Sequence, residues 1–219
     1  MNVLLLRLAG PMQAWGVQSR FGVRDTGREP SKSGVVGLLA AALGRSRYAA
    51  IDDLAALRMG VRVDREGTLL RDYHTAQNVY RAKGGTKETE LSTRYYLADA
   101  AFLVGLEGDP DFLATLYAAL RNPQWMLFLG RRAFVPSEPI WLPNGLREGS
   151  LEEQLHPAAT PWLNGEPRTY PLVRMVIEDK TGSEVRADQP ISFEPRRYAP
   201  RWVVNEYRNV QVDQGQLAQ

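Results

Sequence analysis

The chain has 219 residues, 44% of them hydrophobic, which suffices for a buried core in one large domain or two small ones. It has no cysteine and only two histidines, which excludes a disulfide framework and a thiolate metal site, so no metal or other cofactor is expected. It also lacks an apolar run of about 18 residues and a signal-peptide pattern, and this predicts a soluble, cytoplasmic protein with no membrane partner.

The basic residues are unevenly distributed along the chain. The formal net charge is +2, but the first fifty residues hold seven Lys or Arg against two carboxylates, a local charge of +5. Of the 27 basic residues 23 are Arg, the side chain that binds phosphate through two parallel hydrogen bonds. A GC-rich genome would also enrich arginine, but it would not gather cations around one loop. The clustering therefore favours a polyanionic partner.

The first predicted elements are a strand, a basic loop and a helix. An apolar run over residues 3–8 predicts a buried strand. The polar loop after it carries four cations: Arg20, Arg24, Arg28 and Lys32. A helix is predicted to begin near Ser31 or Ser33 and to end at Gly44, which stands where a left-handed cap belongs. Its apolar residues have the spacing of one buried face: Val35, Leu38, Leu39 and Ala42.

The start of this helix is a candidate phosphate site. Backbone N–H groups in a first helical turn bind anions, so Ser31, Lys32 and Ser33 are expected to receive a phosphate there. The segment does not match the phosphate loop of nucleotide triphosphatases, which needs Gly where Ser31 and Thr26 stand. ATP hydrolysis is therefore not expected.

The middle of the chain alternates between strands and one further helix. Residues 59–65 and 68–76 predict two strands joined by a tight hairpin at Glu66-Gly67. Residues 77–94 predict an extended arm, and residues 95–108 a buried strand. Asp109-Pro110 opens a helix, and a strand is predicted over 125–136. The predicted apolar face of that helix comprises Phe112, Leu113, Leu116, Tyr117 and Leu120.

The order of these elements predicts an α+β fold, with a ferredoxin-like (RRM-like) palm and an inserted β-hairpin thumb. We expect the palm to span residues 1–136, with the thumb at about 77–94. Residues 137–219 are expected to form a connecting loop, pinned by Trp141 and Trp162, and a C-terminal β-rich extension packed on the palm. The extension contains strands at LVRMVIED and around SFEP. It also contains a basic-aromatic cluster: Arg196, Arg197, Tyr198, Arg201 and Trp202.

Arginine-rich loops beside a flat sheet are typical of proteins that bind single-stranded RNA. Enzymes with acidic small-molecule ligands also collect arginines at a helix start, so these features alone leave both classes open. Trp15 and Trp202 are equally compatible with stacking on bases and with a place in the core.

Five segments carry a specific resemblance: QAWG (13–16), SRFGVRDTGREPSKSGVVGLLAAALG (19–44), RDYHT (71–75), RYYLADAAFLVGLEG (94–108) and LFLGRRAFVPSEP (127–139). In this order they resemble the CasD family, the RAMP-superfamily subunit of type I-E CRISPR surveillance complexes (Cascade). The likeness covers roughly residues 1–140, and the tail fits it less closely.

The resemblance implies a non-catalytic, RNA-binding subunit that holds the 5′ handle of the CRISPR RNA. Such a subunit caps the backbone subunit next to the large subunit in antiviral defence, and target DNA is recognised only through the assembled complex. The positions that the resemblance assigns to RNA are Gln13, Trp15, Arg20, Arg24, Thr26, Arg28, Lys32, Ser33, Arg94, Gly130, Arg131 and Arg132. Ala133 and Phe134 depart from the small polar or sulfur residue common after the Arg pair.

A metal-independent endoribonuclease that processes CRISPR repeat RNA is the main alternative. RNA cleavage of this kind needs a base for the 2′-hydroxyl and an acid for the leaving oxygen. His74, Tyr73 and Lys32 would have to supply them, although His74 also fits a hydrogen-bonded residue of a strand, and His156 fits a surface loop. A pure protein–protein scaffold is a third hypothesis, which predicts no loss of RNA when Arg24, Arg28 and Arg131 are replaced.

Overall fold

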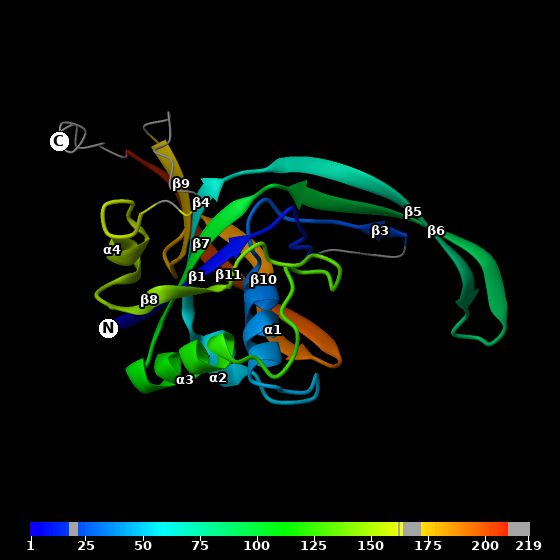
Figure 1. The fold of residues 1–219 in the computed structure, drawn as a ribbon, viewed down its shortest axis with the longest axis horizontal. Coiled ribbons are helices and arrows are strands. Elements are labelled where there is room, and N and C mark those ends of the chain that lie inside the picture. Colours follow the sequence, from blue (N-terminus) through cyan, green and yellow to red (C-terminus); the bar gives the residue numbers. More distant parts are fainter. Residues whose placement is uncertain (18–21, 162, 164–171, 210–219) are drawn as a thin grey trace.

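The computed structural model describes residues 1–17, 22–161, 163 and 172–209, which form a mixed α+β fold around a seven-stranded antiparallel sheet (Figure 1). The strands of this sheet, in spatial order, are β10 (Glu184–Phe193), β11 (Arg196–Asn209), β9 (Leu172–Glu178), β4 (Arg58–Arg65), β7 (Ala101–Gly108), β1 (Asn2–Ala9) and β8 (Trp141–Glu148). The predicted α+β class is confirmed. Helix α1 (Lys32–Ala42) follows β1 and precedes β4, and α3 (Pro110–Arg121) follows β7 and precedes β8.

Alternation along the strands divides the core between the two faces of this sheet. Leu4, Leu6 and Leu8 of β1 pack in the larger cluster with residues of α1 and α3, whereas Val3 and Leu5 pack with α4 (Leu151–Leu155) on the other face. This division follows from the two-residue period of a strand. The short helix α2 (Asp52–Ala56) contributes Leu54 to the α1 side.

The thumb is a long hairpin of β5 (Thr68–Tyr80) and β6 (Thr86–Ala98), which projects from the body in Figure 1. Two short strands, β2 (Met12–Gln13) and β3 (Val23–Arg24), pair with β6 and complete a second sheet of four strands. The thumb begins at Thr68 and is therefore longer than the predicted arm.

The two main helices have the predicted boundaries. Ser31 is the N-cap of α1 and its side chain accepts a hydrogen bond from the backbone N–H of Gly34, while Gly44 has a φ of +72° after the last turn. Asp109 caps α3 in the same way by accepting from the N–H of Phe112. Local sequence signals fix both helices.

Three predictions about strands are wrong. The turn at Glu66-Gly67 exists, but β4 and β5 do not pair there: the chain passes from one sheet to the other, and a Cβ on Gly67 would lie 2.5 Å from the carbonyl oxygen of Ala98. The predicted strand at 95–108 is two strands, because Asp99 turns the chain with a φ of +54°. Residues 125–136 form turns and loops instead of a strand.

The predicted connecting loop also contains regular structure. Strand β8 and helix α4 lie within it, and Trp141 of β8 packs edge-on against Tyr117 at a ring-centroid distance of 6.4 Å. Buried Arg62 of β4 donates hydrogen bonds to the carbonyl oxygens of Leu155, Thr160 and Pro161, which fastens this segment to the large sheet. The predicted role of Trp162 falls outside the described residues.

Candidate nucleic-acid interface

Three arginines from distant parts of the sequence meet at the base of the thumb. Strands β3 and β6 pair in parallel with Arg24 opposite Arg94. The guanidinium of Arg131, in the loop after α3, donates hydrogen bonds to the carbonyl oxygens of Tyr95 at 2.7 Å and Arg24 at 3.2 Å. We call Arg24, Arg94 and Arg131 the thumb-base arginines.

The positive charge of the thumb-base arginines is not neutralised by direct pairing. Among the described residues, no carboxylate oxygen lies within 4.0 Å of a guanidinium nitrogen of these three arginines, which is the limit for an ion pair. Burial lowers the pKa of Arg131, and the charges of Arg94 and Arg24 lower it further, while Asp25 and Asp72 oppose the change. Like charges held together without partners form a ready site for an anion.

The loop that presents Arg131 has a fixed backbone. Gly130 has a φ of +86°, and a Cβ at this position would lie 1.7 Å from the carbonyl oxygen of Ala14. The Arg131 guanidinium lies 5.4 Å from the ring centre of Phe134, close enough for a cation–π contact. Gly130 thus allows the loop to pass close to the backbone of Ala14. Phe134, which departs from the family pattern, supports the side chain of Arg131.

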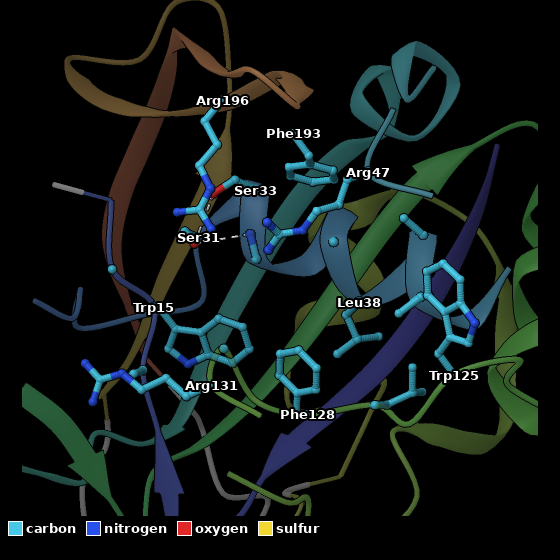
Figure 2. A pocket seen from close by; sticks show the side chains of 18 of the residues that line it. Trp15, Ser31, Ser33, Leu38, Arg47, Trp125, Phe128, Arg131, Phe193 and Arg196 are labelled. Atoms are coloured by element: carbon cyan, nitrogen blue, oxygen red, sulfur yellow. Dashed lines mark hydrogen bonds between the residues drawn. The ribbon is translucent and has the colours of Figure 1, made fainter. Parts of the chain in front are cut away.

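A groove of about 450 Å³ runs from Arg24 and Arg131 along one side of α1 (Figure 2). Small residues of α1, including Ser33, Gly34 and Gly37, lie along it. Five arginines and four large aromatic residues beyond the core line it: Arg24, Arg45, Arg47, Arg131, Arg196, Trp125, Phe128, Phe193 and Tyr198. Asp25 is the one carboxylate among the lining residues that the structure describes.

Gln13 and Trp15 serve the fold, and this corrects their assignment as RNA-facing side chains. Gln13 is fully buried, donates to the carbonyl oxygens of Leu8 and Ala100, and accepts a hydrogen bond from the indole N–H of Trp15. Trp15 is 1% exposed and packs against Gly34 of α1. A base cannot stack on an indole that the core already covers, so Trp15 belongs to the core.

Lys32 is not an exposed cation, which corrects the predicted phosphate site at the start of α1. Its side chain is buried, and its ammonium donates two hydrogen bonds to Glu178, at 2.8 and 3.0 Å. Its backbone N–H donates to the carboxylate of Asp188 at 2.8 Å. Burial lowers the pKa of Lys32, although Glu178 opposes the change. An internal carboxylate thus occupies the anion site that was expected to receive phosphate.

The remaining predicted residues differ in their surroundings. Thr26 stabilises the loop by accepting a hydrogen bond from the backbone N–H of Trp15 and donating to the carbonyl oxygen of Gly27. Ser33 lines the groove, whereas Arg28 and Arg132 are exposed outside it. Arg20 lies outside the described residues.

The residues of the ribonuclease hypothesis do not come together. Tyr73 and His74 are neighbours on β5 and therefore point to opposite faces of the thumb. His74 lies 3.5 Å from Asp72, while Lys32 is held by Glu178 in the other sheet. The described residues thus do not place an acid and a base from this set at one point.

The groove includes residues that the sequence did not single out for binding. Arg45 and Arg47 follow the cap of α1, and Trp125 and Phe128 lie in the segment that was predicted as a strand. Arg196 belongs to the C-terminal basic-aromatic cluster, whose role the sequence left open. The local signals were the two arginines directly after Gly44, at positions 45 and 47, and the basic-aromatic cluster around Arg196.

Comparison with known proteins identifies the family of this chain. The family model described as "CRISPR-associated protein (Cas_Cas5)" matches residues 3–204. The chain belongs to this family. It is 35% identical to the Cascade subunit CasD of Escherichia coli strain K12, with 93% of this chain and 95% of the relative covered. The expected family resemblance is confirmed.

Two solved structures share both sequence and fold with this Cas5-family chain. One, described as a Cas protein, is 46% identical with a TM-score of 0.78, and 95% of each chain is covered. The other belongs to a CRISPR RNA-guided surveillance complex and is 36% identical with a TM-score of 0.80, covering 95% of this chain and 90% of that one.

Among the described residues, no helix is long and apolar enough to span a bilayer.

Proposed function

We propose that this chain is a non-catalytic subunit of a type I-E Cascade complex and holds the 5′ handle of the CRISPR RNA at the thumb-base arginines. The observation that carries the proposal is the convergence of Arg24, Arg94 and Arg131 without carboxylate partners. Guanidinium groups in such a cluster bind successive phosphates of an RNA strand. The relationship to CasD supplies the expected RNA, and sequence choice is left to base pairing.

In this proposal the four strands β4-β7-β1-β8, with α1 and α3, form a ferredoxin-like palm. The support is the order of the strands, all antiparallel, with α1 in the crossover from β1 to β4 and α3 in the crossover from β7 to β8. We propose further that the palm and thumb cap the backbone subunit beside the large subunit of the complex. Strands β9, β10 and β11 then extend the palm sheet beyond β4, as the C-terminal extension.

The test is the salt dependence of RNA binding. Fluorescence anisotropy of labelled CRISPR repeat RNA is measured against NaCl for the full chain and for the triple variant Arg24→Ala, Arg94→Ala, Arg131→Ala. Removing three phosphate contacts is expected to weaken binding about 100-fold and to lower the slope of log K against log salt by about 2.

The matched control removes three cations outside the groove: Arg121→Ala, Lys180→Ala, Arg208→Ala. It has the same net charge as the triple variant, and its affinity is expected to stay within about threefold of the parent. Because Arg131 also binds backbone carbonyls, the pair Arg24→Ala, Arg94→Ala is tested beside the triple variant, with thermal unfolding of each. Unchanged affinity in folded triple and double variants would refute the assignment.

The non-catalytic part of the proposal has its own test. End-labelled repeat RNA is incubated with the full chain in EDTA and resolved on a denaturing gel. Intact RNA is the expected result. Discrete cleavage that disappears in His74→Ala would instead place the chain among the metal-independent ribonucleases.

A further inference from the structure

Arg174 of β9 joins two segments that lead to the thumb-base arginines. Its guanidinium donates hydrogen bonds to both carboxylate oxygens of Glu66, at 2.7 and 2.9 Å, and forms an ion pair of 3.0 Å with Glu29. A longer bond of 3.5 Å reaches the backbone carbonyl oxygen of Arg28. One side chain therefore holds both the turn that enters the thumb and the loop that carries Arg24.

These two segments set the position of the thumb against β3. Glu66 lies in the turn at which the chain passes from β4 into β5, the first strand of the thumb (Figure 1). Glu29 follows Arg24 of β3 by five residues, and β3 pairs with β6 of the thumb with Arg24 opposite Arg94. A shift of the turn relative to the loop would therefore change how these two arginines are presented.

The geometry around Arg174 suits a rigid connection. Arg174 is held in the large sheet, because β9 pairs with β4 and places it opposite Val63. Its side chain is 9% exposed, and that of Glu29 is 13% exposed. The two parallel hydrogen bonds to Glu66 fix orientation as well as distance. A buried guanidinium with carboxylates on two sides thus restrains the turn and the loop relative to each other.

The same ion-pair network has a second arm that does not reach the thumb. Glu29 also accepts a hydrogen bond of 3.1 Å from Arg186 of β10, which in turn donates to Glu184 at 2.9 Å. Glu66 and Glu184 therefore stand at opposite ends of one network, and their side chains are 46% and 41% exposed. Either end can be removed while Arg174 and Arg186 both keep Glu29 as a partner.

We propose that Arg174 is a positioning residue for RNA binding, which holds the thumb and the loop before α1 in the arrangement that brings Arg24 and Arg94 together. The inference rests on the proposed function and deepens it. The thumb-base arginines contact the RNA, and the C-terminal extension, to which none of them belongs, sets their spacing through Arg174. Arg174 itself is buried and acts only through the segments that it holds.

The experiment compares Glu66→Ala with Glu184→Ala. Each variant removes one half-exposed carboxylate of the network, so the change in net charge is the same. The chain has no cysteine, and exposed Lys83→Cys at the thumb tip and Ala114→Cys on α3 can therefore carry a pair of nitroxide labels. Pulsed electron paramagnetic resonance then measures the distribution of distances between thumb and palm. We expect one narrow distribution for the parent and for Glu184→Ala, and a wider one for Glu66→Ala.

RNA affinity of the unlabelled proteins is the second readout. Anisotropy with labelled CRISPR repeat RNA is expected to show about fivefold weaker binding for Glu66→Ala, because the binding arrangement is then populated about a fifth of the time. Glu184→Ala is expected to stay within about twofold of the parent. The midpoints of urea unfolding of the two variants should fall by similar, small amounts, since both ion pairs are half-exposed. A loss of affinity confined to Glu66→Ala is then not a loss of folding.

The outcomes separate this inference from the proposed function. If the parent binds RNA and Glu66→Ala keeps both the narrow distribution and the parent affinity, the inference fails and the proposed function stands. Equal widening in Glu184→Ala would also overturn the inference, because the network as a whole would then be responsible. A wider distribution with unchanged RNA affinity would show that the position of the thumb does not govern binding, and this too refutes it. If the parent itself does not bind RNA, both fail together.

Discussion

Lys32 at the start of α1 and Arg24 at the base of the thumb come from one basic stretch of sequence but differ in what surrounds them. Lys32 shares a buried cluster with Arg201, Glu178 and Asp188, in which two carboxylates balance two cations. The thumb-base arginines have no such partners among the described residues. Local charge density therefore indicates where cations are, and only pairing distinguishes those that hold the fold from those available to RNA.

The loop before α1 shows the same contrast between paired and unpaired charges at Arg28 and Glu29. Glu29 accepts hydrogen bonds from Arg174 and Arg186, so the C-terminal sheet holds this part of the loop in place. Burial would lower the pKa of Arg174, but its bonds with Glu66 and Glu29 raise it above its usual value. Arg28, one residue away, remains exposed. Adjacent charges in this loop thus have separate roles in folding and in recognition.

The largest expected effect is on the paired cluster. Asp188→Asn removes the carboxylate that accepts two hydrogen bonds from Arg201 and one from the Lys32 N–H. Because buried cations remain without their partner, the free energy of unfolding is expected to fall by about 3 kcal/mol. Urea unfolding at pH 7 measures it.

Asp53→Asn is the control for this variant, since the Asp53–Arg45 pair lies at the surface. Its cost is expected to stay below about 1 kcal/mol. Equal losses in the two variants would mean that burial does not separate the two groups of cations. RNA affinity of the folded Asp188→Asn protein is expected to stay close to that of the parent, because no thumb-base arginine has changed.

A smaller effect is expected when the presentation of an unpaired cation is disturbed. Gly130→Ala places a Cβ against the carbonyl oxygen of Ala14 and forces the loop with Arg131 to move. Stability is expected to fall by about 2 kcal/mol. RNA affinity is expected to fall about tenfold, as measured by anisotropy.

Gly84→Ala is the matched control. Gly84, at the tip of the thumb, has a φ of +89° but no atom within 4 Å of an added Cβ. Backbone strain alone should cost about 1 kcal/mol and leave RNA binding unchanged. If both substitutions weaken RNA binding equally, the contact of Gly130 with Ala14 is not what positions Arg131.

The parts of the fold that the sequence predicted are those with local signals. Ser31, Gly44 and Asp109 mark helix ends through hydrogen bonds and backbone angles within a few residues of themselves. The passage of the chain between sheets at Gly67 was not predictable in this way, because the same turn residues serve hairpins and crossings alike. The turn at Gly67 becomes a crossing between sheets because β5 pairs with β6 and not with β4.

The candidate site was predictable in part for the same reason. The sequence and its resemblance gave Arg24, Arg94 and Arg131, whereas the burial of Lys32 depends on Glu178 and Asp188, which lie 146 and 156 residues away. Phe193 and Arg196 join the groove only because the C-terminal hairpin folds beside α1. Contacts between residues so far apart in the sequence cannot be predicted from a local sequence pattern.

The smallest expected effect separates the two groups of cations by pH. The hydrogen bond from Arg45 lowers the pKa of Asp53 below its usual value of about 3.9, so this pair contributes stability above that pH and loses it as the pH falls through the lowered value. The small difference in unfolding free energy between the parent and Asp53→Asn should therefore persist from pH 7 to about 4 and vanish below it. The RNA affinity of folded Asp53→Asn should follow that of the parent at every pH from 8 to 5; a divergence would show that a neutralised cation also contributes to RNA binding.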